Sequence, residues 1–264
     1  MKNILKASLL ILLGCSSAPK FTDKDVCILV YNMTDRRYEY KENDKQCHVR
    51  FPTCSTFKVP LSVMAFDAKV LKDKTTKFKW DGEKRFLDVW NKDHTADSWM
   101  KESVVWYSQK LTPMIGEKRI SDYLQKFSFG NGDMSGGLKS AWLTPAGPER
   151  NSLKINAHEQ IAFTEKLWRG ELEASQYAMT TTQEILAQDS SPKGNILKGK
   201  TGSGLVGEKQ DLRLGWYVGH LQAGKKEYIL VVNFVDKQNQ PGKTFGGMEA
   251  KAIGIDTFKE LDLW

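Results

Sequence analysis

The sequence predicts an α/β protein of the α+β kind, in which segments from both ends of the chain build one antiparallel sheet around a helical insertion. Strand-like segments stand near both ends: Val26–Met33 near the start, and Leu214–Leu221 and Tyr228–Asp236 near the end. The region between them has the pattern of helices and loops. With 264 residues, of which 40% are hydrophobic, the chain is long enough for one large domain or two interleaved subdomains.

The first expected elements are two strands and a helix. Val26–Met33 is short, β-branched and aromatic, and Thr34–Arg37 predicts a reversal into a second strand around Tyr38–Tyr40. Ser55–Val70 has apolar residues at helical spacing and therefore predicts a helix. Pro60 lies early in that helix, where its missing N–H costs little.

The later elements follow from the same patterns. Asn156–Gly170 has the pattern of an amphipathic helix that its final glycine ends. Ala223–Lys225 predicts a turn between the two C-terminal strands, and residues 247–261 predict a closing helix.

We expect a single mature domain over residues 21–264, because the sequence shows neither repeats nor a disordered linker. Its sheet subdomain would comprise about 21–57 and 190–264, and its helical subdomain about 58–189.

Residues 1–20 have the features of a secretory signal. Lys2 and Lys6 precede the apolar run Leu9–Leu13, which is too short to span a bilayer. Leu12–Cys15 also matches a bacterial lipobox, in which the cysteine is lipidated. We therefore expect export to the bacterial periplasm, and both a plain cleaved signal and a lipid anchor on Cys15 stay open.

Export permits disulfides, but the pairing among Cys27, Cys47 and Cys54 stays open because three cysteines leave one over. The 4 histidines lie far apart, no two of them have metal-ligand spacing, and no C-x-x-C occurs, so we expect no metal site. The net charge is +7, but lysines alternate with acidic residues, as in Leu71–Arg85. This pattern favours a solvated surface over a nucleic-acid site.

The string GNILKGKTG, Gly194–Gly202, matches the phosphate-binding loop G-x-x-x-x-G-K-[ST]. Such a loop must follow a buried strand and open a helix. Here the polar segment AQDSSPK precedes it, and the glycines in GSGLVGEKQD, which follows Thr201, disfavour a helix. The alternative is that Lys200–Gly202 is the K-T-G of serine penicillin-recognising enzymes, which requires a serine and a lysine elsewhere.

Ser55-Thr56-Phe57-Lys58 supplies that S-x-x-K pattern. The pattern also occurs at three other places, but only this copy opens the strongest predicted helix. A serine and a lysine three residues apart at a helix start share one face, so the amine can reach the hydroxyl. The serine needs such a base to act as a nucleophile, and the helix N-terminus favours a developing oxyanion.

With these motifs the chain resembles the class D serine β-lactamases, the oxacillinase type, over essentially the whole mature sequence. The motifs stand in the family's order, and we list them as they occur: S-T-F-K at Ser55–Lys58, S-x-V at Ser103–Val105, F-G-N at Phe129–Asn131, the tryptophan Trp142, and K-T-G at Lys200–Gly202. The resemblance implies the serine β-lactamase and penicillin-binding transpeptidase-like fold, with a sheet, flanking helices and a helical subdomain.

The resemblance also implies a mechanism. Ser55 would attack the lactam carbonyl of a penicillin-type antibiotic and form an acyl-enzyme that water hydrolyses. Lys58 would be carboxylated by CO2 (N6-carboxylysine) and act as general base, while Ser103 would move a proton toward the lactam nitrogen. CO2 is then the one added group, with no other cofactor and no metal.

The remaining expected site residues contact the substrate or its surroundings. Trp142 would donate its indole N–H to the carbamate, and the backbone N–H groups of Ser55 and Ser203 would form the oxyanion hole. The expected substrate-binding residues are Val105, Trp142, Lys200, Thr201, Gly202, Ser203 and, as a wall of the pocket, Trp90.

One position departs from the family. Many class D enzymes carry a carboxylate-binding arginine where this chain has Gly246, and Lys200, Thr201 or Lys243 would have to replace it. Two alternative functions stay open, namely a penicillin-binding peptidase and a non-hydrolysing β-lactam sensor. The sequence also leaves the choice between monomer and homodimer open.

Overall fold

The computed structural model describes residues 20–144, 152–240, 242–243 and 245–264. Residues 1–19 of the predicted signal, including Cys15, lie outside the described residues, as does most of the loop at 143–151. Among the helices in the described ranges, none combines the length and the hydrophobicity that a membrane crossing requires.

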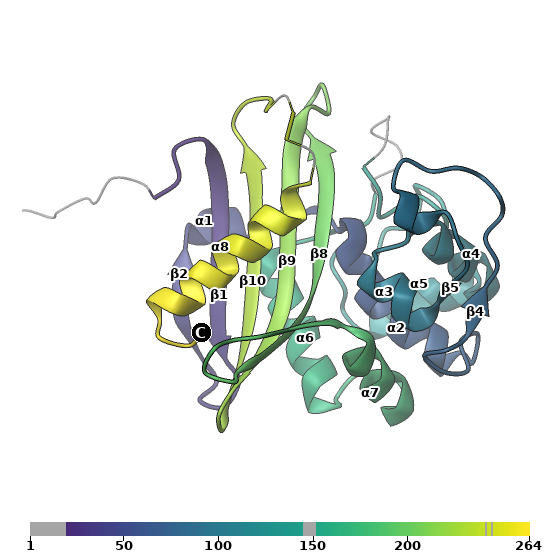
Figure 1. Ribbon diagram of the computed structural model, residues 1–264, viewed down its shortest axis with the longest axis horizontal. Coiled ribbons are helices and arrows are strands. Elements are labelled where there is room, and N and C mark those ends of the chain that lie inside the picture. The colour runs from purple at the N-terminus through teal and green to yellow at the C-terminus, as the bar shows by residue number, and fades with distance from the viewer. Residues whose placement is uncertain (1–19, 145–151, 241, 244) are drawn as a thin grey trace, which may run out of the picture.

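A six-stranded sheet forms the centre of the molecule (Figure 1), in the order β2-β1-β10-β9-β8-β7. All neighbouring strands are antiparallel. The strands are β1 (Lys24–Asn32), β2 (Arg37–Glu42), β7 (Ala187–Ser190), β8 (Ile196–Val206), β9 (Leu212–Ala223) and β10 (Lys226–Asp236). Because β1 pairs with β10, the predicted antiparallel sheet built from both ends of the chain is confirmed.

Both faces of the sheet are covered, which explains its nearly continuous apolar strands. Successive side chains of a strand point to opposite faces. In β1, Cys27 and Leu29 join the core on the side of the helical region, whereas Ile28 and Val30 join the core under the C-terminal helix.

Two helices cover the sheet. The C-terminal helix α8 (Gly246–Glu260) crosses the near face in Figure 1, and α6 (Ala157–Arg169) lies on the far face. Asn156 caps α6 and exchanges hydrogen bonds with Glu159, and Gly170 ends the helix with a left-handed φ of 72°. These local signals explain why the predicted boundaries of α6 agree with the structure.

The helical region lies beside the β8 side of the sheet (Figure 1). Its central helix α2 is buried from Lys58 to Phe66 and packs against α4 and α7. The elements between β2 and β7, apart from α6, are α1 (Asp44–Cys47), β3 (Phe51–Pro52), η1 (Cys54–Phe57), α2 (Lys58–Asp67), β4 (Lys77–Phe78), η2 (Asp88–Trp90), β5 (His94–Thr95), α3 (Ala96–Lys101), α4 (Val105–Ile115), α5 (Glu117–Lys126), β6 (Lys154–Ile155) and α7 (Gln176–Ile185).

The helix predicted over Ser55–Val70 is divided in two. Its first turn is the 3-10 helix η1, and the α-helix α2 begins only at Lys58. Pro60 has no N–H to pair with the Thr56 carbonyl, as an α-helical first turn would require. Ser55 therefore lies in a tighter turn just before the α-helix.

The disulfide pairing that the sequence left open is Cys27 with Cys47. This bond attaches the short helix α1 to the central strand β1. Cys54, the neighbour of Ser55, is a free and buried thiol.

Candidate active site

A cleft of about 760 Å³ opens between the helical region and β8, the strand that contacts η1. The predicted site residues that line it are Ser55, Trp90, Ser103, Val105, Thr201 and Ser203. Segments far apart in the sequence therefore contribute to one cavity, and two more predicted residues, Lys58 and Trp142, lie fully buried close to it.

Ser55 and Lys58 are in direct contact. The Lys58 Nζ lies 3.1 Å from the Ser55 Oγ, within hydrogen-bond distance. The serine belongs to η1 and the lysine is the first residue of α2, so the tight first turn directs both side chains the same way. An amine this close to the hydroxyl can take up its proton.

Lys58 is completely buried, which is rare for a lysine. Burial lowers the pKa of its amine well below the ordinary value, and the charge of Lys200 lowers it further. The aromatic rings of Phe57 and Trp142, 5.1 Å apart, form part of this apolar region. Burial therefore favours the neutral form of this amine over the charged one.

The indole N–H of Trp142 is buried and has no hydrogen-bond partner among the described residues. A buried donor without an acceptor costs roughly 1–3 kcal/mol, so such groups are uncommon. The Trp142 backbone carbonyl accepts a hydrogen bond of 2.9 Å from the N–H of Cys54, which ties the tryptophan to the residue before Ser55. The indole thus supplies a free donor next to the Ser55 turn.

Cys54 does not compete with Ser55 as a nucleophile. Burial raises the pKa of its thiol to about 12 despite the nearby Lys58, so the sulfur stays protonated.

Ser103 lies between α3 and α4 with a left-handed φ of 57°. Non-glycine residues seldom adopt this conformation, and it is enriched at functional sites. Here it presents Ser103 to the cleft between Glu102 and Val105.

Lys200 lies within β8 and not at the start of a helix, which contradicts a phosphate-binding loop at Gly194–Gly202. Its side chain is almost fully buried, and its Nζ donates to the Thr201 carbonyl at 3.0 Å. Burial, with a smaller effect of the Lys251 charge, lowers the pKa of Lys200 to about 7. Lys200 can therefore change its charge near neutral pH.

The glycines of β8 let the strand approach the Ser55 turn. A Cβ at Gly202 would lie 3.2 Å from Thr56, and one at Gly204 would lie 2.7 Å from the Cys54 sulfur. Larger residues at these positions would push the strand away from the serine, so β8 is built to lie close to it.

The wall formed by Trp90 and Val105 is held by backbone acceptors. The Trp90 indole donates to the Glu102 carbonyl at 2.9 Å, and the Trp90 carbonyl accepts from Trp106 at 2.8 Å. Val105 begins α4 and also lines the cleft.

The F-G-N element supports the site from behind. The side chain of Asn131 donates to the Ser152 carbonyl at 2.8 Å and accepts from the Lys154 N–H at 2.9 Å. The Phe129 ring lies 6.5 Å from that of Phe57. These contacts place the element against the Ser55 turn and not in the cleft itself.

Gly246 occupies the position where many class D enzymes carry an arginine, and the surrounding backbone leaves no room for a side chain there. A Cβ there would lie 2.7 Å from the Leu214 carbonyl. Lys243 does not line the cleft, whereas Lys101 does. Lys101 is thus a cation that the sequence analysis did not single out.

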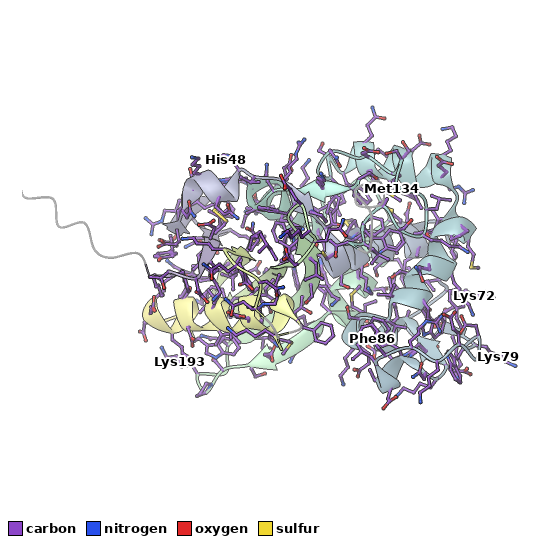
Figure 2. All side chains as sticks on the ribbon, turned by 90° about the horizontal axis from the view of Figure 1, so that it is seen from above. His48, Lys72, Lys79, Phe86, Met134 and Lys193 are labelled. Atoms are coloured by element: carbon purple, nitrogen blue, oxygen red, sulfur yellow. A yellow bond between two sulfur atoms is a disulfide. The ribbon has the colours of Figure 1, made fainter. Side chains whose placement is uncertain are left out.

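The cleft also has an apolar rim that was not predicted from the sequence; it is made by Phe86, Leu205, Phe245 and Met248. The rings of Phe86 (labelled in Figure 2) and Phe245 stack at 6.2 Å, and Phe86 is 74% exposed. Exposed aromatic residues carry no periodic signal, and only the tertiary structure brings these segments together.

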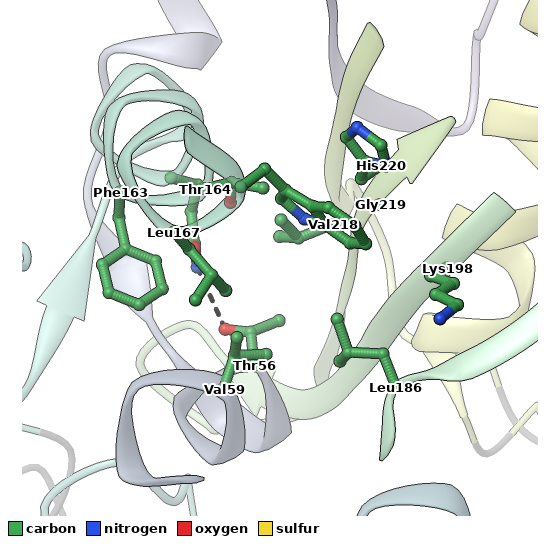
Figure 3. A pocket seen from close by; sticks show the side chains of 12 residues that line it. Thr56, Val59, Phe163, Thr164, Leu167, Leu186, Lys198, Val218, Gly219 and His220 are labelled. Carbon is green, nitrogen blue, oxygen red and sulfur yellow. Dashed lines mark hydrogen bonds between the residues drawn. The ribbon is translucent and has the colours of Figure 1, made fainter. Parts of the chain in front are cut away.

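A second cavity lies on the other side of the Ser55 turn, between α6 and the sheet (Figure 3). It measures only about 10 Å³, room for about one water molecule. The hydrogen bond drawn there, 3.0 Å from Gln160 to the Thr56 hydroxyl, fixes the residue next to Ser55. This cavity is a packing defect behind the site and does not hold a substrate.

Known proteins are similar to this chain in sequence and in fold. The family model of the penicillin binding protein transpeptidase domain matches residues 22–259. Beta-lactamase OXA-1 of Escherichia coli is 36% identical over 255 residues, covering 94% of this chain and 88% of that protein. The probable beta-lactamase YbxI of Bacillus subtilis is 34% identical over 92% of this chain and 84% of its own length.

Solved structures agree with these relatives. The class D beta-lactamase BAT-2 superposes with a TM-score of 0.79 at 32% identity, over 91% of this chain and 93% of that one. A class D beta-lactamase of Bacillus subtilis gives the same TM-score at 33% identity and the same coverage. The methicillin resistance protein mecR1 of Staphylococcus aureus is 27% identical, and the match covers 39% of its length.

Proposed function

The chain belongs to the class D β-lactamases, serine hydrolases that open the β-lactam ring, and from this premise we propose that Ser55 is its nucleophile. The observation that carries the proposal is the 3.1 Å contact between the hydroxyl of Ser55, which lines the cleft, and the buried amine of Lys58. It pairs a weak nucleophile with a base whose burial favours the uncharged form.

The proposed reaction has two stages. The Ser55 Oγ attacks the lactam carbonyl carbon and releases its proton toward the Lys58 side chain, while the ring C–N bond breaks and Ser103 delivers a proton to the nitrogen. Water then attacks the resulting ester, and the penicilloate-type acid leaves Ser55 free. The N–H groups of Ser55 and Ser203 stabilise the oxyanion in both stages.

Lys200, Thr201 and Gly202 form the β8 side of the substrate site in this proposal, and Val105 and Trp90 form the opposite wall. Lys200 provides positive charge for the substrate carboxylate while it is protonated. Since no side chain fits at Gly246, we propose that Lys101 at the cleft edge contributes the remaining positive potential.

We further propose that Lys58 carries a carbamate formed from CO2. Only a neutral amine reacts with CO2, and the lowered pKa of Lys58 meets that requirement. The unpaired indole N–H of Trp142 fits a donor that holds the carbamate. When present, the carbamate supplies an anionic general base, which a neutral or protonated lysine does not.

The disulfide between Cys27 and Cys47 supports export to an oxidising compartment, because such bonds are rare in the reducing cytosol. We propose the periplasm as that compartment, with residues 1–20 as the signal. Sequencing the N-terminus of the mature protein would show whether cleavage leaves Cys15 as the first residue.

Turnover of a chromogenic cephalosporin tests the hydrolase against a slow peptidase or a sensor. The wild type should hydrolyse many equivalents, and Ser55→Ala should hydrolyse none. Mass spectrometry after brief exposure to penicillin should show one adduct on the Ser55 peptide. A single burst without turnover would favour the sensor, and an adduct on Ser98 or Ser190 would overturn the nucleophile.

A further inference from the structure

Three metal-ligating side chains converge on the surface away from the cleft. They are Asp44, His48 and His158, and their ligand atoms all lie within 4.8 Å of one another. The His158 Nε2 is 3.1 Å from one Asp44 oxygen, and the His48 Nε2 is 3.6 Å from the other. Figure 2 labels His48 at the surface, beside helix α1.

The backbone holds these residues in place from two sides. Asp44 opens α1 and His48 follows it at its C-terminus, so the two lie four residues apart on one helical face. The disulfide at Cys47 fixes α1 to the sheet. His158 lies in the first turn of α6, whose start is set by the Asn156 cap.

The donor set suits a borderline transition-metal ion. Two imidazole nitrogens and one carboxylate oxygen are ligands that Zn²⁺ binds at about 2.0–2.2 Å. Two donors at that distance and a tetrahedral angle lie about 3.3 Å apart. The observed contacts of 3.1 and 3.6 Å between the carboxylate and the two imidazoles are close to this spacing. The two imidazole rings are stacked at 4.3 Å and must rotate so that both Nε2 atoms face one ion.

A second contact can support either tautomer of His158. The Tyr38 hydroxyl lies 2.9 Å from its Nδ1. Without an ion, Nε2–H donates to the Asp44 carboxylate at 3.1 Å and the Tyr38 hydroxyl can donate to Nδ1. When an ion replaces the Nε2 proton, Nδ1–H can donate to the Tyr38 oxygen instead, and the Nε2 lone pair is free for the metal. Such an outer partner is a regular feature of histidine ligands and raises their basicity.

The positive charge of Lys41 opposes a cation at this cluster. Its Nζ lies 3.5 Å from the same Asp44 oxygen that contacts His158, and it stacks over the Tyr38 ring at 4.3 Å. The lysine is 40% exposed and can turn into solvent, so its charge weakens the site without blocking it.

We propose that Asp44, His48 and His158 bind one Zn²⁺ or similar divalent transition-metal ion, with water in the remaining position. The ion joins α1 to α6 and so stabilises the folded chain, because it binds the native state only. The site is separate from the β-lactam cleft and does not depend on the proposed catalytic residues.

The test is a calorimetric titration of ZnCl2 into the chelator-stripped protein. We expect one ion per chain. His48→Ala and His158→Ala should each weaken binding more than about 100-fold, because each removes a direct ligand, whereas the positioning change Tyr38→Phe should cost about 10-fold.

Two further variants sharpen the result. Lys41→Ala should strengthen binding, which a purely structural role of the cluster does not predict. Lys45→Ala, an exposed change on the same helix, should leave the affinity unchanged and serves as the matched control. Unchanged β-lactam turnover verifies that each variant is folded.

A Kd weaker than about 1 mM for the wild type would overturn the proposal. So would tight binding that survives both histidine substitutions, because the ion would then lie elsewhere. Zinc protection against thermal unfolding should appear in the wild type and disappear in His48→Ala.

Discussion

The indole N–H of Trp142, which has no partner among the described residues, makes the proposed carbamate testable by one substitution. Trp142→Phe removes the Nε1–H but keeps an aromatic ring against Phe57, whose ring lies 5.1 Å away. Since the N–H has no partner among the described residues, the substitution breaks no hydrogen bond of the protein itself. Its effect should therefore fall on the carbamate.

The expected magnitude follows from the hydrogen bond that would be lost. A hydrogen bond to a charged group is worth about 1.5–3 kcal/mol. At about 1.4 kcal/mol per factor of ten, the half-saturating bicarbonate concentration should rise about 10- to 150-fold in the variant. At saturating bicarbonate the steady-state rate should return toward that of the wild type.

The assay is steady-state turnover of a chromogenic cephalosporin against bicarbonate concentration in degassed buffer. Trp99→Phe is the matched control, because Trp99 is as buried as Trp142 but its indole donates to the Ser108 hydroxyl at 2.9 Å. This control should lower thermal stability and leave the bicarbonate dependence unchanged. If Trp142→Phe and the wild type need the same bicarbonate concentration, the indole does not hold a carbamate, and the reasoning fails.

Three further results are expected. In CO2-free buffer Lys58→Met should raise the Tm at pH 7 by more than about 2–4 °C, the shift that 1 kcal/mol produces. The reason is that the folded-state pKa of Lys58 is depressed, so the lysine destabilises the fold at every pH below its unfolded pKa of about 10.4. The gain in Tm should therefore vanish in melts above that pH. In saturating bicarbonate kcat/KM should fall as the pH rises through about 7, where Lys200 of the free enzyme loses its proton. This decrease of kcat/KM with pH should be absent in Lys200→Arg, and an unchanged decrease would assign it to another group. Replacing both Cys27 and Cys47 by alanine opens a loop with a sequence separation of 20 and should lower the free energy of unfolding by about 3 kcal/mol. Calorimetry should then show a Tm lower by about 6–12 °C. An unchanged Tm would show that the disulfide adds no stability.

The sequence alone determined the features that depend on near neighbours. The three-residue spacing of Ser55 and Lys58 at a helix start places amine and hydroxyl together through backbone geometry. The cap at Asn156 and the left-handed Gly170 set both ends of α6. The β-branched and aromatic segments at both ends of the chain were sufficient to predict the strands there, because strand propensity is a local property.

Only the tertiary structure decided what depends on contacts between distant segments. The close approach of β8 to the Ser55 turn, which the glycines of the strand permit, is visible only in the packed structure. The cysteine pairing was open until the packing of α1 on β1 brought Cys27 and Cys47 together. No sequence pattern showed that a side chain at Gly246 would collide with β9.

The Asp44, His48 and His158 cluster shows the same division. The four-residue spacing of Asp44 and His48 is visible in the sequence, but the expectation of no metal site considered only spacings between histidines and between cysteines. His158 lies 114 residues after Asp44 and reaches it only because α6 packs across the sheet to which the disulfide ties α1. Residues close together in the sequence determine where helices and strands form. The residues of a surface site that two such elements share are determined by how these elements pack against each other.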